Sequence, residues 1–213
     1  GEILIEEPVD KVLINNKKAL GVKTRDGHAY YAPNIVIATP INDARNILQD
    51  FAKIDELNNL FSLPTMSATT LQIELNKPSL EKDITTFAPM TNLVSFAEQS
   101  RSTFRNKSGR LSIILGKNQE FCEYSAEELL KIVIKELKEV GIDISNNVVK
   151  CRKISEKEEF YSLTPGSERL RPKQNTNIKG LILAGDYTKT SSLCTMESAV
   201  ISGKKAAQLC MKK

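Results

Sequence analysis

The chain has 213 residues, of which 40% are hydrophobic and 26% charged, so it is long enough to bury the core of one domain or of two small ones. Its net charge of +4 arises from 30 basic and 26 acidic residues that do not cluster, and no nucleic-acid-binding surface is predicted. The four cysteines form no C-x-x-C pair and there is one histidine, which argues against a zinc site and favours a reduced, cytoplasmic setting.

The start of the chain indicates a piece of a longer protein. Residue 1 is Gly rather than Met, and an apolar run follows directly. The sequence opens with no signal peptide, and no apolar run approaches the ~18 residues that suggest a membrane span. We therefore expect a soluble fold, and either an excised piece or a chain from which a tag was cleaved would explain the start at Gly1.

The first forty residues predict a β meander that leads into an apolar strand. Strands are expected at 9–14, 19–24 and 29–32, because turn residues, including Asp26-Gly27, separate them. The segment 35–39 predicts a strand that ends at Pro40. Since its apolar residues do not alternate with polar ones, we expect both of its faces to be buried.

The middle of the chain predicts a mixture of helices and strands. The clearest helix spans 126–140, where Ser125 and Glu128 form a capping box and Gly141 ends the helix. A second helix is expected over 42–60. Strands are predicted at 69–75, 93–96, 110–116 and 147–154.

The last third predicts a strand, a loop and a helix. An apolar strand at 180–186 ends in Gly185 and Asp186, at the carboxyl end where open α/β sheets bind ligands. A polar loop leads to a helix over 196–210, whose first N–H groups near Thr195 favour an anion or a polarised oxygen. Small residues recur every four positions and predict close backbone packing, at Ala199, Gly203 and Ala207. A plain core unit of strand, loop and helix is the alternative.

The same residues carry a resemblance to a known superfamily. The segment 181–207, LILAGDYTKTSSLCTMESAVISGKKAA, is similar to the carboxy-terminal FAD signature of the amine oxidases, protoporphyrinogen oxidases and phytoene desaturases. That signature reads A-G-D/E, about eight further residues, then M-E-G-A-V-x-S-G-x-x-A-A. Ser198 stands where the superfamily usually has Gly, and this small residue leaves the match intact.

The resemblance implies cofactor contacts for seven residues. Gly185 and Asp186 would lie beside the FAD pyrophosphate and ribityl chain. The backbone of Thr195 and Met196 would face the flavin N1–O2 edge, where a helix N-terminus stabilises negative charge, and Ala199 would pack nearby. Two residues of the meander, Val9 and Thr39, match positions next to the FAD adenine.

The implied fold class is α/β (α+β), a partial FAD/NAD(P)-binding-like domain joined to a mixed-sheet substrate domain. Residues 1–40 and 156–213 would form the FAD-binding part, and residues 41–155 the substrate-binding domain. The chain contains no G-x-G-x-x-G motif, which the superfamily carries near its amino terminus. We therefore expect the missing amino-terminal FAD-binding segment to be a partner, and this chain by itself to bind FAD weakly or not at all.

Within the superfamily, phytoene and ζ-carotene desaturases and squalene-type enzymes such as hydroxysqualene dehydroxylase match best. Ala184-Gly185-Asp186-Tyr187-Thr188 fits their A-G-D-Y-T, and the approach over 160–172 is also similar. Amine oxidases place an aromatic residue where this chain has Thr195. The implied substrate is an apolar isoprenoid hydrocarbon that exchanges hydride with flavin, which requires no acid–base side chain, so no catalytic residue is predicted.

The sequence is compatible with two alternatives. The chain could belong to an amine or protoporphyrinogen oxidase, or it could be a non-catalytic interaction module or half of a split flavoprotein. A peripheral membrane contact is compatible with an apolar substrate. His28 is expected at the surface, beside a hairpin turn.

Overall fold

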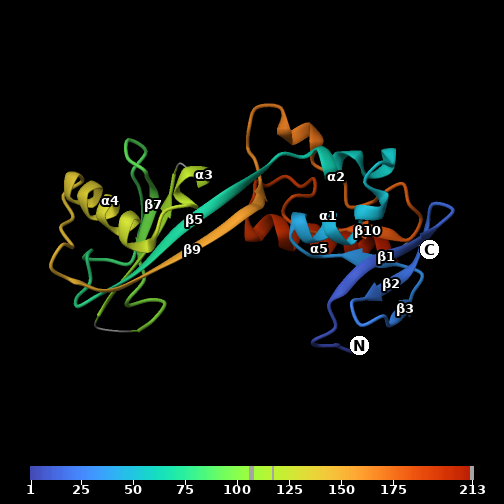
Figure 1. Cartoon of the computed structure of the whole chain (residues 1–213), viewed down its shortest axis with the longest axis horizontal. Helices are drawn as coiled ribbons and strands as arrows, with labels where there is room; N and C mark the ends of the chain where they lie inside the picture. Colours follow the sequence, from blue (N-terminus) through green and yellow to red (C-terminus); the bar gives the residue numbers. More distant parts are fainter. Residues whose placement is uncertain (106–107, 117, 212–213) are drawn as a thin grey trace. The chain divides into compact units, whose positions relative to one another are not determined.

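The computed structural model describes residues 1–105, 108–116 and 118–211. They form two units, the first built from residues 1–65 and 159–213 and the second from residues 66–158 (Figure 1). The two terminal segments share the first unit, as their resemblance to a single domain implies. The division lies after residue 65 rather than after residue 40, because the helical segment that follows residue 40 packs into the core of the first unit.

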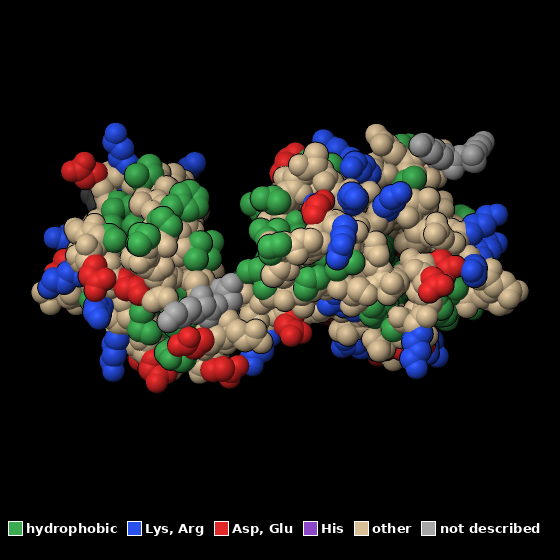
Figure 2. Space-filling view, turned by 90° about the horizontal axis from the view of Figure 1, so that it is seen from above, with side chains coloured by type: hydrophobic (Ala, Val, Ile, Leu, Met, Phe, Trp, Pro, Cys, Tyr) green, Lys and Arg blue, Asp and Glu red, His purple; other side chains and the backbone are tan. Residues whose placement is uncertain are grey.

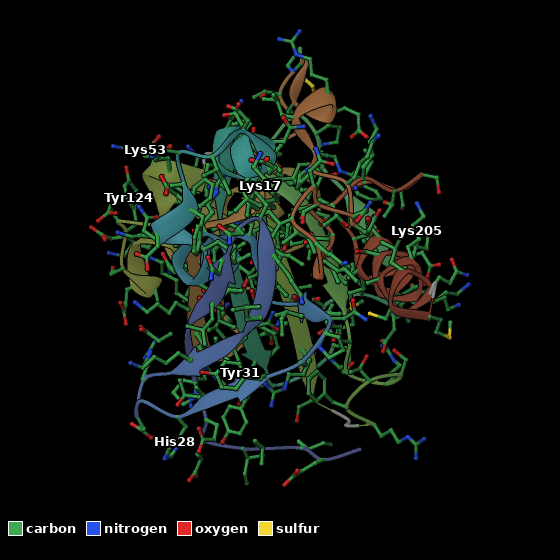
Figure 3. The ribbon with its side chains drawn as sticks, turned by 90° about the vertical axis from the view of Figure 1, so that its right-hand side faces the viewer. Lys17, His28, Tyr31, Lys53, Tyr124 and Lys205 are labelled. Carbon is green, nitrogen blue, oxygen red and sulfur yellow. The ribbon has the colours of Figure 1, made fainter. Side chains whose placement is uncertain are left out.

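The first unit begins with a three-stranded antiparallel sheet. Its strands run in the order β1 (Val9–Asn15), β2 (Lys18–Thr24) and β3 (Ala29–Tyr31). The turn between β2 and β3 holds Gly27 at a φ of 92°, which glycine adopts without strain. His28 and Tyr31 lie at the surface of this hairpin, as expected for the histidine (Figure 3).

The second sheet of this unit joins the two ends of the chain. The strand β4 (Ile35–Ile37) pairs in parallel with β10 (Leu181–Leu183), with Ile37 opposite Leu183. All three residues of β10 are buried, whereas Val36 in β4 is 40% exposed. The prediction that β4 is buried on both faces is therefore wrong, because Ile35 and Ile37 pack into the core on one face while Val36 is exposed on the other.

The predicted helix over 42–60 is interrupted. The structure has short helical pieces there: α1 (Ile41–Ile47), η1 (Gln49–Phe51), η2 (Asp55–Leu57) and α2 (Asn58–Ser62). The guanidinium of Arg45 donates hydrogen bonds to the carbonyls of Leu60 and Leu63, which fold the second half of the segment back onto the first. Leu48, Leu57 and Leu60 thereby enter one core, which a single straight helix could not achieve.

The unit closes with a loop and the carboxy-terminal helix. The loop after Tyr161 contains a short 3₁₀ turn, η3 (Ser167–Leu170), and α5 (Met196–Met211) follows β10. Lys205 projects from α5 into solvent (Figure 3). The buried face of α5 consists of Ser198, Ser202 and Ala206.

The second unit is a five-stranded sheet with a helix packed against it. The strand order is β6-β7-β8-β5-β9, and α4 (Ala126–Glu139) covers the sheet through Leu129, Val133 and Leu137. The Ser125–Glu128 capping box is present and Gly141 follows the helix at a φ of 87°, so both predicted helix ends are confirmed. The remaining elements are β5 (Thr65–Leu75), β6 (Thr85–Phe87), β7 (Leu93–Glu98), β8 (Gly109–Leu115), α3 (Asn118–Phe121) and β9 (Val148–Tyr161).

Two strands are longer than predicted, since β5 begins at Thr65 rather than at residue 69, and β9 ends at Tyr161 rather than at residue 154. The strand expected at 147–154 extends to Tyr161, where mixed charges hid the continuation.

Side chains of both signs are visible on each unit in Figure 2. No helix in the described ranges is long and apolar enough to cross a membrane.

Candidate functional site

The carboxyl ends of β4 and β10 lie side by side in the first unit. Ile37 pairs with Leu183, and the N–H of Ala184 donates to the carbonyl of Ile37 at 2.8 Å. Thr39 and Gly185 follow these two strands and therefore lie at the same end of the sheet. In parallel sheets this edge is where ligands bind, because loops and helix N-termini converge there.

A groove with a volume of about 710 Å³ runs along the open side of β4. Val9, at the start of β1, and Thr39 both line it, so the structure brings together the two residues predicted near the adenine. The other predicted residues lie beyond this lining, on the loop after β10 and on α5. The rest of the lining comes from β1–β4, the segments next to these strands and α1, and includes Val22, Arg25, Tyr30, Asn34, Asp43 and Asn46.

Gly185 is required by its neighbour Tyr187. A Cβ at position 185 would overlap the ring of Tyr187, which is fully buried under the loop. The N–H of Gly185 donates to the Oγ of Ser202 at 2.9 Å. The glycine thus lets the backbone pass between a buried ring and α5, which ties the end of β10 to the helix.

Asp186 is half-buried and links the loop to the residues just before α5. Its Oδ2 accepts a hydrogen bond from the thiol of Cys194 at 3.1 Å, and its carbonyl lies 3.4 Å from the Oγ of Ser198. Burial, together with the hydrogen bond to Asp186, raises the pKa of Cys194 to about 12. The thiol therefore stays protonated at neutral pH and serves as a donor to the carboxylate.

The start of α5 is exposed, as an anion-facing helix N-terminus requires. The Oγ1 of Thr195 accepts from the N–H of Ser198 at 3.2 Å and caps the helix, and Met196 is 89% exposed. The first N–H groups of a helix lack partners within the helix, so those of Met196 and Glu197, ahead of the capped N–H of Ser198, are available to a ligand. Ala199 is also exposed, one turn further on.

The packing predicted for the small-residue strip on α5 has no counterpart among the described residues. Among the described residues no heavy atom lies within 4 Å of a Cβ placed on Gly203, and Ala199 and Ala207 are exposed as well. The face that packs is rotated by one position along the helix, to Ser198, Ser202 and Ala206. Serine hydroxyls on that face bond to the loop, which repetition of small residues alone could not reveal.

Arg171 donates several hydrogen bonds to the loop between β10 and α5, a role that the sequence did not predict. The residue is 2% exposed, and its guanidinium donates to the carbonyls of Asp186 at 3.0 Å, Thr188 and Ser192 at 3.1 Å. It also donates to the Oγ1 of Thr190 at 3.1 Å. An arginine followed by proline in a polar loop gave no sign of burial.

A second set of polar contacts joins the loop to α5. The Nε2 of Gln174 donates to the Oγ1 of Thr188 at 3.1 Å and to the carbonyl of Lys189 at 3.0 Å. The hydroxyls of Thr188 and Ser202 lie 2.7 Å apart. Each of these side chains is buried, and their hydrogen bonds offset the removal of polar groups from water.

Two buried tyrosines complete the floor of the site. Burial raises the pKa of both Tyr161 and Tyr187, so both phenols are neutral at physiological pH. The guanidinium carbon of Arg171 lies 5.0 Å from the ring centre of Tyr161, a cation–π contact that occupies this aromatic face. Neither ring is exposed to a ligand at the surface of the loop.

Comparison with known proteins defines the class to which this fold and loop belong. Residues 1–211 match the family described as flavin containing amine oxidoreductase, and the chain belongs to that family. It lies in the superfamily of FAD-dependent amine oxidases and phytoene desaturases, which confirms the resemblance drawn from residues 181–207.

Particular relatives include carotenoid enzymes. The chain is 26% identical over 98% of its length to a 15-cis-phytoene desaturase of Solanum lycopersicum and 24% identical over 96% to a zeta-carotene desaturase of Synechocystis sp.. It spans 38% and 47% of these relatives, respectively. A solved putrescine oxidase triple mutant shares the fold with a TM-score of 0.72 at 13% identity, over 97% of this chain and 49% of that one.

The residues present fit the flavin cofactor of this family. The exposed helix N-terminus at Met196 suits a negatively polarised edge, and the half-buried carboxylate of Asp186 suits sugar or ribityl hydroxyls. The groove beside Val9 and Thr39 offers space along the open side of β4. No group of three or more metal-ligating side chains occurs in the described part of the chain, and its four cysteines are free thiols.

Proposed function

We propose that this chain is the carboxy-terminal part of an FAD-dependent oxidoreductase that acts on an isoprenoid hydrocarbon. The observation that carries the proposal is that the loop after β10 folds back, so that Asp186 contacts residues at the start of α5. The hydrogen bonds of Asp186 with Cys194 and Ser198 put its carboxylate next to the first turn of α5. A carboxylate and a helix N-terminus side by side at the carboxyl end of a parallel sheet suit a flavin dinucleotide.

Five of the seven predicted residues then have a defined task. FAD, when bound, supplies the hydride chemistry. Asp186 binds hydroxyl groups of the cofactor, and the backbone at Thr195 and Met196 donates to the negatively polarised flavin edge. Val9 and Thr39 bind the adenine end in the groove. These contacts orient the cofactor, and no side chain of the chain is assigned to proton transfer.

The open side of β4 supports a missing segment as partner. Because the N–H of Ile35 and the carbonyl of Ile37 bond towards β10, the N–H and C=O of Val36 point to the other side. Strands of parallel sheets are normally buried on both faces, and proteins normally cover or pair an open strand edge. We therefore expect a strand of the amino-terminal FAD-binding segment to pair along β4 and line the same groove.

An apolar substrate is supported by the surface next to the site. Leu193, Met196 and Val200 are 59%, 89% and 51% exposed, and the last two lie one helical turn apart. This surface would receive an isoprenoid chain close to the flavin. We also propose that such a substrate is drawn from a membrane or a lipid store.

An amine or protoporphyrinogen oxidase is the second candidate, favoured by the fold shared with putrescine oxidase. It has less support because the chain lacks tryptophan and has Thr195 at the aromatic position. Tyr161 and Tyr187 cannot replace that aromatic residue, since both are buried and the face of Tyr161 already meets Arg171.

The test is flavin retention with and without the missing segment. The chain is purified alone and after co-expression with the upstream part of its reading frame, and flavin per mole is measured after gel filtration. We expect little flavin alone and near-equimolar flavin with the segment. Loaded protein is then mixed anaerobically with a polyene or with an amine, and bleaching of the flavin absorbance is followed.

The outcomes separate the candidates. Bleaching by the polyene supports the isoprenoid enzyme, and bleaching by the amine supports the second candidate. Retention of flavin by the chain alone would contradict the need for the segment. Absence of flavin from both preparations would identify a non-catalytic module instead.

A further inference from the structure

Arg171 spans the whole loop between β10 and α5 with one side chain. Its acceptors include the carbonyls of Asp186, at the start of the loop, and Ser192, near its end. The Nη2 also lies 3.4 Å from the Oγ of Ser198, in the first turn of α5. A single guanidinium thus connects both ends of the loop with the helix that follows.

The contacts of this guanidinium are mainly with neutral groups. Glu168 accepts at 3.0 Å, but its side chain is 56% exposed, so water screens the ion pair. The remaining acceptors are carbonyl and hydroxyl oxygens, and the Nε has no hydrogen-bond partner among the described residues. Burial of a cation is unfavourable unless its donors are satisfied. The energetic advantage of Arg171 therefore depends on the loop keeping one conformation.

Lysine could not make the same set of contacts. A guanidinium presents its donors in a planar fork, whereas an ammonium is a compact group with three donors. The acceptors of Asp186, Thr188 and Thr190 meet Nη2, while that of Ser192 meets Nη1, so both arms of the fork are used. The geometry is specific to arginine.

We propose that Arg171 is a positioning residue, which holds the loop 186–195 and the first turn of α5 in the conformation that presents Asp186 and the N–H groups near Met196 to one ligand. The identity of that ligand as FAD rests on the proposed function. The ordering of the loop by Arg171 does not, because every contact involved lies within the described chain.

The first measurement needs no flavin. Hydrogen exchange is followed in peptides covering 186–198 and, as an internal reference, β1 and β2. The variant is Arg171→Ala, and the matched control is Arg169→Ala, which removes the same charge from an exposed side chain two residues away. We expect exchange in the loop to accelerate about tenfold or more in Arg171→Ala, while β1, β2 and the control stay unchanged.

Rescue separates positioning from simple loss of stability. Millimolar guanidinium chloride should restore protection of the loop in Arg171→Ala, and sodium chloride at equal ionic strength should not. Arg171→Lys keeps the charge and should remain faster than wild type; it also carries the measurement if the alanine variant does not fold. Unchanged exchange in the loop, or a uniform rise that guanidinium does not reverse, would overturn the proposal.

The second measurement tests the ligand. In protein completed with the upstream segment, we expect the dissociation constant for FAD to rise about tenfold or more in Arg171→Ala and to recover with guanidinium. Equal FAD affinity in wild type and variant would overturn the positioning role. If wild-type protein binds no FAD, the proposed function fails, and the loop exchange still decides whether Arg171 orders the loop.

Discussion

The thiol of Cys194 donates a hydrogen bond to the carboxylate of Asp186, with Sγ 3.1 Å from Oδ2. The two residues lie at opposite ends of the loop after β10, and the bond closes that loop. Because a thiolate would be buried next to a carboxylate, the pKa of Cys194 is raised to about 12. Cys194 is thus protonated in the folded loop, and its proton forms the hydrogen bond to Asp186.

The first prediction concerns the reactivity of this thiol. With a pKa of about 12, the thiolate fraction of Cys194 at pH 8 is only about one in ten thousand. We expect alkylation of Cys194 by iodoacetamide at pH 8 to be at least about tenfold slower than that of a free model thiol. Mass spectrometry of the peptide containing Cys194 measures the rate.

The control for Cys194 is Asp186→Asn, which removes the negative charge beside the thiol. This variant should react faster than wild type, because one of the causes of the raised pKa is lost while burial remains. Equal rates in the two proteins would mean that Asp186 and Cys194 do not interact in solution.

The second prediction contrasts two glycines. Gly185→Ala places a Cβ against the ring of Tyr187 and should lower the free energy of unfolding by ~1–3 kcal/mol. Gly203→Ala adds a methyl group in open space on an exposed helix face, and should raise it by ~0.5–1 kcal/mol. Urea unfolding of the purified chain measures both. A loss of similar size at Gly203 would show that this face of α5 is packed in solution.

The third prediction tests the capping box of α4. Ser125→Ala removes the side-chain acceptor for the N–H of Glu128 and should lower the free energy of unfolding of the second unit by ~1 kcal/mol. Lys135→Ala, in the middle of the same helix and exposed, is the control and should have little effect. Denaturant unfolding followed by helical circular dichroism would reveal the difference; identical curves would remove the capping box as a source of stability.

The fourth prediction concerns acid. Hydrogen bonds from the N–H of Ser102, aided by its hydroxyl and by Arg101, outweigh the effect of burial and lower the pKa of Asp83 from 3.8 to about 2. A lowered folded-state pKa gives stability that is fully present above 3.8 and is lost as the pH falls towards about 2. Asp83→Asn should therefore be less stable than wild type at pH 7, and the difference should shrink through this range.

Thermal midpoints measured between neutral and acid pH check this dependence on Asp83. Asp26→Asn, at an exposed hairpin turn, supplies the matched loss of a carboxylate. A gap between wild type and Asp83→Asn that stays constant down to pH 2 would assign the stability of this loop to contacts other than the ionised carboxylate.

The sequence by itself determined the elements whose signals are local. The capping box at Ser125 and Glu128 specifies the start of α4, because both partners lie within one turn. The turn at Asp26-Gly27 specifies the β2–β3 hairpin in the same way. The residues from Gly185 to Met196 also identified the family, since their spacing along the chain is itself the signal.

Only the tertiary structure decided which side chains organise the candidate site. Arg171 and Gln174 act on carbonyls about fifteen residues away, and such contacts leave no periodicity in the sequence. The packed face of α5 was likewise set by hydroxyls that reach the loop, at Ser198 and Ser202, rather than by the strip of small residues. Burial of Arg171 is favourable only where the folded chain supplies its acceptors, and that condition is a property of the fold.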